Sequence, residues 1–189
     1  MSPSYLASTA QMTVEEVQST LTTFPDLEYN QDGKIVSVGL SLLPTPHRLW
    51  FNEQALFAWC ALDTLMYPVL LQQSAKVESP CLVTGQMIRL TVTPTRILNL
   101  EPPEAVVSLV APTCSGQSCC TRGDFCDQVH FFSSEAVAKS WQAAHHEGEI
   151  VSVAEAYHLG QALAQRCVEP QALPIPTAGH SVTGSNCAP

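Results

Sequence analysis

The sequence predicts an α+β protein, with a small N-terminal winged-helix-like subdomain followed by a mixed β-sheet core flanked by helices. Short strand-like runs bounded by proline, glycine or serine alternate with longer segments of helical periodicity. Of the 189 residues, 46% are hydrophobic and only 13% are charged, so the chain can bury one sizeable core. Composition then divides the chain into an N-terminal subdomain (1–45), a core domain (46–169) and a flexible tail rich in Pro, Ala, Gly, Ser and Thr (170–189).

The N-terminal subdomain is expected to contain two short helices and a hairpin. The expected helices span 3–11 and 13–24, and the expected strands span 27–29 and 35–42. Thr13 and Glu16 have the spacing of a capping box, and the turn at 30–33 contains Asp32 and Gly33, which tolerate positive φ. Helices followed by a hairpin suggest a winged helix-turn-helix. A DNA-binding regulator is disfavoured, because the second helix carries two acidic side chains and no basic one.

The core is expected to alternate strands with three longer helices. The expected strands span 48–51, 75–78, 87–92, 105–110 and 128–132, and the expected helices span 53–71, 133–145 and 152–167. The first of these helices, capped by Asn52, is apolar nearly all round, which predicts burial at the centre of the fold. Pro68 is expected to kink or end it. Ser152 and Glu155 form a second capping-box pattern at the start of the last helix.

Cys60 and Asp63 form the first part of a candidate site. On a helix, residues three apart lie on the same face about one turn from each other. A buried carboxyl group in so apolar a segment must be paired, hydrogen-bonded or protonated with a raised pKa. A raised pKa is what a proton donor at neutral pH requires. A lone Cys60 would be read as a core residue, and Asp63 shifts the interpretation toward chemistry.

Cys126 supplies a second thiol from a distant, strand-like segment at 125–132. It also ends a run of four cysteines, with Cys114, Cys119 and Cys120 before it. A structural zinc site would need paired cysteines two to four residues apart, matched by a second pair. The run lacks that form, so an auxiliary soft-metal site on a loop is the better interpretation.

The remaining cysteines and histidines have weaker signals. Cys81, in an expected turn, is interpreted as a packed structural thiol, and His130 as a core residue or a neighbour of the site. His145 and His146, at an expected helix end, fit a helix cap better than a metal site. The roles of the two remaining cysteines, near or within the tail, cannot be assigned from the sequence; they are Cys167 and Cys187.

Charge and composition exclude several classes of partner. The formal net charge is −9, and only Lys34 and Arg48 are basic within the first fifty residues, so neither nucleic acid nor an anionic membrane is expected to bind. The sequence contains no signal-peptide pattern and no apolar run long enough to cross a bilayer. A cytoplasmic protein is therefore expected, with its thiols mostly reduced.

Residues 56–65, LFAWCALDTL, resemble the active-site helix of the organomercurial lyases (alkylmercury lyases). The resemblance continues in order over roughly residues 14 to 165, including the hairpin. The further matching segments are 79–85, 106–110, 125–126, 129–132, 150–153, 155–156 and 159–161. Asp127 stands where the family often has another cysteine, and the N-terminal helical region is shorter than typical.

The resemblance implies an enzyme of mercury resistance and detoxification. By motif, the family's catalytic cysteines and aspartate match Cys60, Cys126 and Asp63, and its third cysteine, usually regarded as structural, matches Cys81. The implied reaction is protonolysis of a carbon–mercury bond, which gives a hydrocarbon and Hg(II) held by Cys60, Cys126 and Asp63. No cofactor is implied, and the expected acceptors of Hg(II) are cellular thiols and a mercuric reductase.

An alternative remains open at the level of sequence. The same thiols suit a mercury- or copper-binding or sensing protein without lyase activity. Asp63 distinguishes the two, because binding needs only thiols, whereas protonolysis also needs an acid. The sequence does not predict the preferred organic group, the turnover rate or the oligomeric state.

Overall fold

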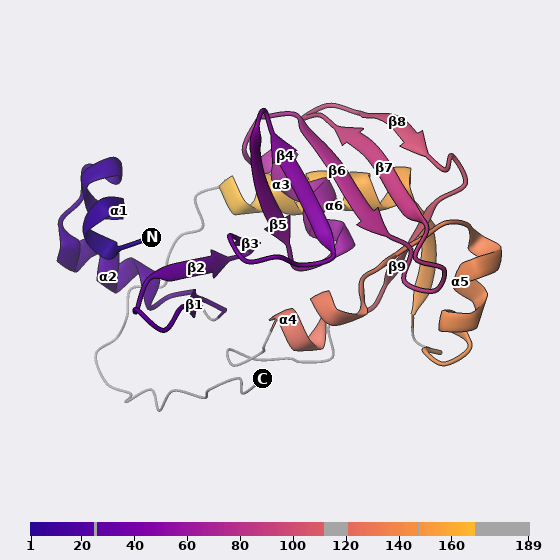
Figure 1. The fold of residues 1–189 in the computed structure, drawn as a ribbon, viewed down its shortest axis with the longest axis horizontal. Helices are drawn as coiled ribbons and strands as arrows, with labels where there is room; N and C mark the ends of the chain where they lie inside the picture. Colours follow the sequence, from indigo (N-terminus) through magenta and orange to yellow (C-terminus); the bar gives the residue numbers. More distant parts are fainter. Residues whose placement is uncertain (25, 112–120, 147, 169–189) are drawn as a thin grey trace.

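An eight-stranded antiparallel sheet forms the centre of the computed structural model, which describes residues 1–24, 26–111, 121–146 and 148–168 (Figure 1). Its strand order is β1-β2-β3-β5-β4-β6-β7-β8. The strands are β1 (Glu28–Tyr29), β2 (Ile35–Val38), β3 (Leu40–Ser41), β4 (His47–Phe51), β5 (Gln54–Ala58), β6 (Ala75–Pro80), β7 (Met87–Val92) and β8 (Ile97–Glu101). The predicted α+β class, with a sheet core flanked by helices, is confirmed.

The N-terminal elements agree with the predicted ones in type and order. Helices α1 (Pro3–Ala10) and α2 (Val14–Leu21) precede the β1–β2 hairpin, and the Thr13–Glu16 capping box is present. Strand β3 pairs with both β2 and β5, so the hairpin continues into the large sheet. A winged-helix unit is not confirmed by this arrangement, and the domain boundary at residue 45 stays a prediction.

The helix predicted over 53–71 is wrong in its first half. Residues Gln54–Ala58 form β5, which pairs antiparallel with β4, and only Ala61–Leu70 form helix α3. Asn52, expected to cap the helix, instead takes a positive φ of 55° in the tight β4–β5 turn. Cross-strand pairing overrides a helical pattern when a strand can join an existing sheet. Pro68 lies inside α3, which ends two residues later.

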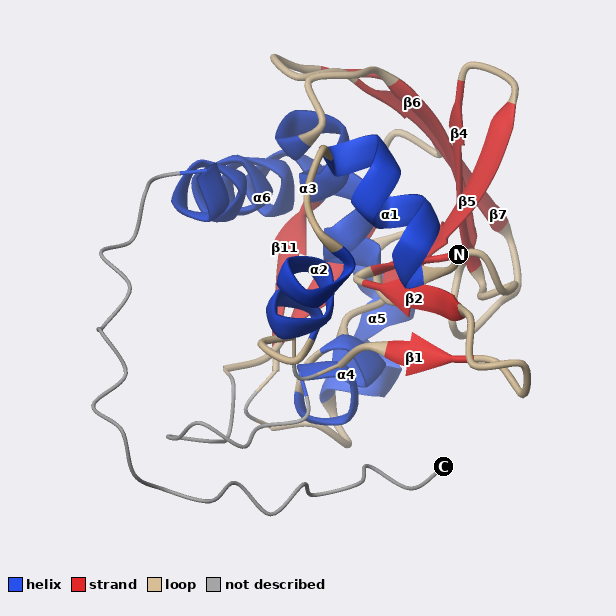
Figure 2. Ribbon diagram, turned by 90° about the vertical axis from the view of Figure 1, so that its left-hand side faces the viewer, coloured by secondary structure: helices blue, strands red, loops and turns tan. Residues whose placement is uncertain are grey.

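Helices α3 and α6 (Val153–Val168) pack against each other on one side of β4–β7 (Figure 2). A side chain at Gly160 would put its Cβ 3.3 Å from the Met66 backbone, so glycine allows the two helices to approach closely. The predicted Ser152–Glu155 capping box is present at the start of α6. No helix in the described ranges is long and apolar enough to span a bilayer.

A second, three-stranded sheet, ordered β10-β9-β11, lies beside helix α5 (Glu135–Gln142). Its strands are β9 (Val106–Leu109), β10 (Phe131–Phe132) and β11 (Glu149–Ser152). The strand predicted over 128–132 is therefore reduced to two residues. The preceding segment forms the short helix α4 (Thr121–Asp124) and the 3-10 turn η1 (Cys126–Gln128). Strands β8 and β11 were not predicted.

Candidate active site

The three predicted site residues lie together in the structure. Cys60 is the N-cap residue of α3, Asp63 is in its first turn, and Cys126 begins the η1 turn. One ligand atom from each lies within 4.8 Å of the other two, and the described residues contain no other such group of His, Cys, Asp and Glu. The structure thus confirms the proximity predicted for these side chains.

The backbone at the start of α3 positions Asp63. Its Oδ2 accepts a hydrogen bond from the Cys60 N–H at 3.1 Å, in the geometry of a capping box with cysteine at the N-cap position. The same oxygen lies 3.9 Å from the Cys126 Sγ, which places it as the acceptor for that thiol proton. The carboxylate therefore contacts both cysteine residues.

The η1 turn carrying Cys126 is attached to two neighbouring elements. The Ala61 N–H donates to the Val129 carbonyl oxygen at 3.1 Å, which joins the start of α3 to the end of the turn. Ser108 on β9 donates its hydroxyl to the Gln128 carbonyl and accepts the His130 N–H, both at 2.9 Å. These bonds fix the position of Cys126 relative to α3, although the segment is not a strand.

Burial controls the protonation of the site. Cys60 and Cys126 are only 0% and 3% exposed. Burial raises the pKa of the Cys60 thiol, and the neighbouring Cys126 and Asp63 act in the same direction. Burial also raises the pKa of Asp63 to about 6, although hydrogen bonds from Cys60, Trp59 and Cys126 oppose the shift. Asp63 as a whole residue is half-buried, but its carboxyl end is enclosed by protein.

A cleft of about 490 Å³ opens beside Cys126, and we refer to it as the thiol cleft. Its walls carry two cysteines, two histidines and charged side chains. The residues that line it are Thr45, Pro46, His47, Trp59, Pro80, Cys81, Leu82, Gly85, Arg122, Cys126, Asp127 and His130. The thiol cleft thus carries polar and charged groups on a largely apolar wall, and it leads to one of the two site thiols.

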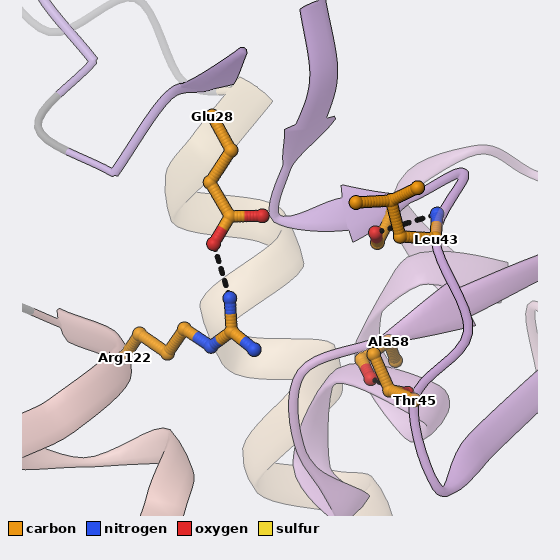
Figure 3. A network of polar contacts seen from close by, with 6 residues as sticks. Glu28, Leu43, Thr45, Ala58 and Arg122 are labelled. Carbon is orange, nitrogen blue, oxygen red and sulfur yellow. Dashed lines mark hydrogen bonds and ion pairs between the residues drawn. The ribbon is translucent and has the colours of Figure 1, made fainter. Parts of the chain in front are cut away.

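Arg122 was not predicted from the sequence. It forms an ion pair with Glu28 on β1, which links α4 to the N-terminal hairpin (Figure 3). Its guanidinium also lies over the Trp59 ring, 5.7 Å from the centroid. Glu28 and Arg122 are 94 positions apart, and neither has a local motif, so no sequence signal indicates this contact.

Cys81 is buried in the wall of the thiol cleft, in agreement with the prediction of a packed thiol. Burial opposes its ionisation, but hydrogen bonds from Thr84, Ser133 and Val83 outweigh that effect and lower the pKa to about 7. His47, another residue that the sequence did not single out, is 5% exposed, and its Nδ1 lies 2.8 Å from the Ser79 hydroxyl. Burial and the nearby His130 lower the pKa of His47 to about 4.

His145 and Cys167 lie outside this group, and the cysteines of the predicted auxiliary soft-metal site cannot be placed. His145 stacks on Trp141, with 4.2 Å between ring centroids, which agrees with a structural position after α5. Cys167 is exposed on α6. Cys114, Cys119, Cys120 and Cys187 lie outside the described residues, and so does the predicted tail beyond residue 168.

Comparison with known proteins adds to this geometry. The family model described as alkylmercury lyase (MerB) matches residues 40–165. An alkylmercury lyase from Staphylococcus epidermidis is 44% identical over 156 residues, which cover 82% of this chain and 71% of that protein. An alkylmercury lyase from Bacillus cereus is 43% identical over 164 residues, which cover 87% and 74%.

A solved structure agrees with these relatives. The crystal structure of the mercury-bound form of MerB2 superimposes with a TM-score of 0.72 and 29% sequence identity. The match covers 87% of this chain and 82% of that one. The family model, the sequence relatives and the fold all agree, and we conclude that this chain belongs to the alkylmercury lyase family.

Proposed function

We propose that this protein is an organomercurial lyase that cleaves carbon–mercury bonds by protonolysis, releasing a hydrocarbon and Hg(II). The observation that carries the proposal is the group of two buried thiols and one carboxyl within 4.8 Å. Family membership supports it, because the relatives are named alkylmercury lyases. The substrate class is therefore an organomercury compound, R–Hg–X.

The first step is capture of the substrate by a thiol. Mercury is a soft metal and prefers thiolate to oxygen ligands. Asp63 takes the proton of Cys126, whose Sγ lies 3.9 Å from its Oδ2, and the sulfur bonds to mercury as X leaves. If X is a cellular thiolate, it leaves with the proton that Asp63 took from Cys126. Asp63 is then a carboxylate again, and R–Hg is bound to Cys126 without a change in net charge.

The second step breaks the carbon–mercury bond. Cys60 bonds to mercury and gives its proton to Asp63, and two thiolate ligands push electron density onto the bound carbon. Asp63 then transfers its proton to that carbon, whose bonding pair to mercury becomes the new C–H bond. RH leaves, and Hg²⁺ remains on Cys60 and Cys126 beside Asp63. The raised pKa of Asp63 suits a group that must accept and then release a proton.

We further propose that no resident cofactor is needed, because these three side chains supply both the metal ligands and the acid. Removal of Hg²⁺ then requires free thiols, and a mercuric reductase is the expected final acceptor. Reduced thiols are the form required for each step, which fits a cytoplasmic location. Neither nucleic acid nor a membrane is proposed as a partner, since the net charge is −9.

The decisive experiment is the Asp63→Asn substitution, which keeps the size of the side chain and both thiols. We expect the variant to capture phenylmercury, visible as an adduct by intact mass. We also expect it to release benzene on the order of 10²-fold or more slowly, the usual effect of removing a positioned acid–base group. Single-turnover benzene release measures the second quantity.

Asp127→Asn is the matched control, because Asp127 is an exposed carboxylate next to Cys126 that lines the thiol cleft. It should release benzene at the parent rate. Parent-like release by the Asp63→Asn protein would show that the proton comes from another group. If the parent itself bound the compound without releasing benzene, it would be a metal-binding protein, an alternative that family membership does not favour.

A further inference from the structure

We propose that the organic group of the substrate occupies an apolar cavity along α3, on the other side of Trp59 from the thiol cleft. This inference rests on the proposed lyase function and adds to it the place where the group R is recognised. The cavity has a volume of about 410 Å³ and is referred to below as the helix cavity. Its lining residues are Phe24, Asp26, Val38, Gly39, Trp59, Met66, Tyr67, Leu70 and Cys167.

The helix cavity continues the face of α3 that carries Asp63. Residues Met66, Tyr67 and Leu70 follow Asp63 by three, four and seven positions. On an α-helix these spacings place side chains on one face, one turn after another. All three residues line the cavity. Asp63, the proposed proton donor, therefore lies one turn before them on the same face of α3.

The reaction geometry selects this side of the site. The carbon that receives the proton must come within hydrogen-bond reach of the Asp63 carboxyl group. Mercury must meanwhile contact the sulfurs of Cys60 and Cys126. An organic group bonded to that mercury then extends past Asp63, and the surface next encountered along α3 is the stripe of Met66, Tyr67 and Leu70.

The chemistry of the two cavities also differs. Phe24 and Val38 also line the helix cavity, and most of its lining is hydrocarbon. The thiol cleft instead presents Arg122, Asp127 and two imidazoles. Burying an apolar group against hydrocarbon is favourable, whereas placing it against charged groups displaces their water.

The size of the helix cavity is sufficient for an aryl group. A dry cavity of about 150 Å³ already holds benzene in another protein. Trp59 lines both cavities and lies next to Cys60 in the chain. We therefore assign the thiol cleft to thiol carriers and the departing Hg²⁺, and the helix cavity to R and the product RH.

The test fills each cavity from an exposed position. Val38→Trp adds a large side chain to the helix cavity, and Leu82→Trp adds the same side chain to the thiol cleft. The parent residues are 40% and 49% exposed, so both substitutions begin from a similar surface position. The measurement is kcat/KM for phenylmercury and for methylmercury, with excess thiol, in parent and both variants.

We expect Val38→Trp to lower the ratio of phenylmercury to methylmercury kcat/KM by at least about tenfold, because a filled pocket discriminates against the larger group. Leu82→Trp should leave the ratio unchanged, even if both rates fall together. The inference is overturned if Leu82→Trp lowers the ratio and Val38→Trp does not, or if neither changes it.

Two further results keep the test interpretable. Phe24→Ala removes an exposed aromatic side chain that lines the helix cavity and introduces no larger residue. A phenyl group then loses apolar contact, so this variant should also lower the ratio, even if the Val38→Trp protein is unstable. An unchanged ratio in Phe24→Ala would then count against the inference. If the parent cleaves neither compound, the proposed lyase function itself fails, a result distinct from cleavage with unaltered selectivity.

Discussion

At the scale of single residues, burial disfavours the charged form of two groups in the site. Cys60 is fully buried with a raised pKa, and Asp63 has a pKa of about 6. A thiol that stays neutral until a soft metal arrives does not leave an unpaired charge in the core. Proton transfer to Asp63 then accompanies metal binding, so charge develops only as mercury neutralises it.

Both thiols are predicted to be required. A single thiolate can hold R–Hg⁺ but cannot supply the second electron donor that makes the carbon basic. We expect Cys60→Ser and Cys126→Ser each to abolish turnover of an arylmercury compound, measured by arene release. Cys187→Ser, at a thiol that the proposed mechanism does not use, is the control and should retain turnover. Full turnover by either of the first two variants would contradict the assignment.

His47 predicts a pH dependence of stability. Its folded-state pKa is about 4, lowered by burial and by His130, against 6.5 in a free side chain. The unfolded chain therefore takes up this proton first, and stability is lost as pH falls from 6.5 to 4, by about 3 kcal/mol in all. Below pH 4 both states are protonated, and the contribution of His47 stops changing.

Urea unfolding of the parent and His47→Gln proteins between pH 7 and pH 4 tests this dependence. Other groups titrate in both proteins, so the difference between the two curves isolates His47. The parent should lose more stability than the variant over this interval. Parallel pH profiles would show that His47 is not responsible.

At the scale of elements, the site depends on where a strand stops and a helix starts. Pairing with β4 ends β5 at Ala58, and α3 begins at Ala61, which makes Cys60 an N-cap residue. A cap residue has extended backbone geometry, and its N–H is free to bond to the carboxylate three residues later. The spacing of Cys60 and Asp63, which we propose to be catalytic, is therefore also a capping motif.

Gly39, between β2 and β3, is predicted to be essential for packing against α3. It has a φ of +71°, and an added Cβ would lie 1.6 Å from the Tyr67 hydroxyl oxygen. Gly85 has nearly the same φ, +70°, with nothing within 4 Å of the added atom. Backbone strain alone should cost either Ala variant about 1–2 kcal/mol.

Gly39→Ala should lose about 1–3 kcal/mol more than Gly85→Ala, the typical cost of overpacking, because Tyr67 must move. The free energy of unfolding measured in denaturant gives both values. Combining Gly39→Ala with Tyr67→Phe removes the atom at 1.6 Å and should recover part of the loss. Equal costs for the two glycine substitutions would contradict the proposed clash.

At the scale of the whole molecule, three parts of the chain meet around Trp59. The N-terminal hairpin contributes Glu28 and Val38, and the α4–η1 segment contributes Arg122 and Cys126. Helix α3 contributes Asp63 and the apolar face that follows it. The ion pair of Arg122 with Glu28 connects the first and third of these parts (Figure 3). Two cavities of different polarity lie next to Trp59 as a result.

The extra cysteines at 114, 119 and 120 are predicted to be dispensable for bond cleavage. The mechanism uses only Cys60, Cys126 and Asp63, so a variant with all three extra cysteines changed to serine should release arene at the parent rate in a single turnover. The later transfer of Hg²⁺ to added thiols is the step at which a difference is expected. A slower first turnover would show that these thiols take part in capture or cleavage.

The sequence by itself was enough to predict the α+β class, both capping boxes and the three residues of the proposed site. These depend on local patterns or on motifs, namely the Thr13–Glu16 and Ser152–Glu155 spacings and the matched segments around Cys60 and Cys126. Hydrogen bonds between residues three apart determine the capping boxes, and motif similarity identifies the proposed site residues. Both can be recognised without knowing which segments meet.

Only the tertiary structure decided that residues 54–58 form a strand, that Cys126 lies on a turn, and that Arg122 contacts Glu28 and Trp59. The first depends on pairing with β4, and the second on bonds from Ser108 to the segment around Gln128. The third joins positions far apart in the chain. Each is a long-range interaction, whose energy is set by a partner that the local sequence does not identify.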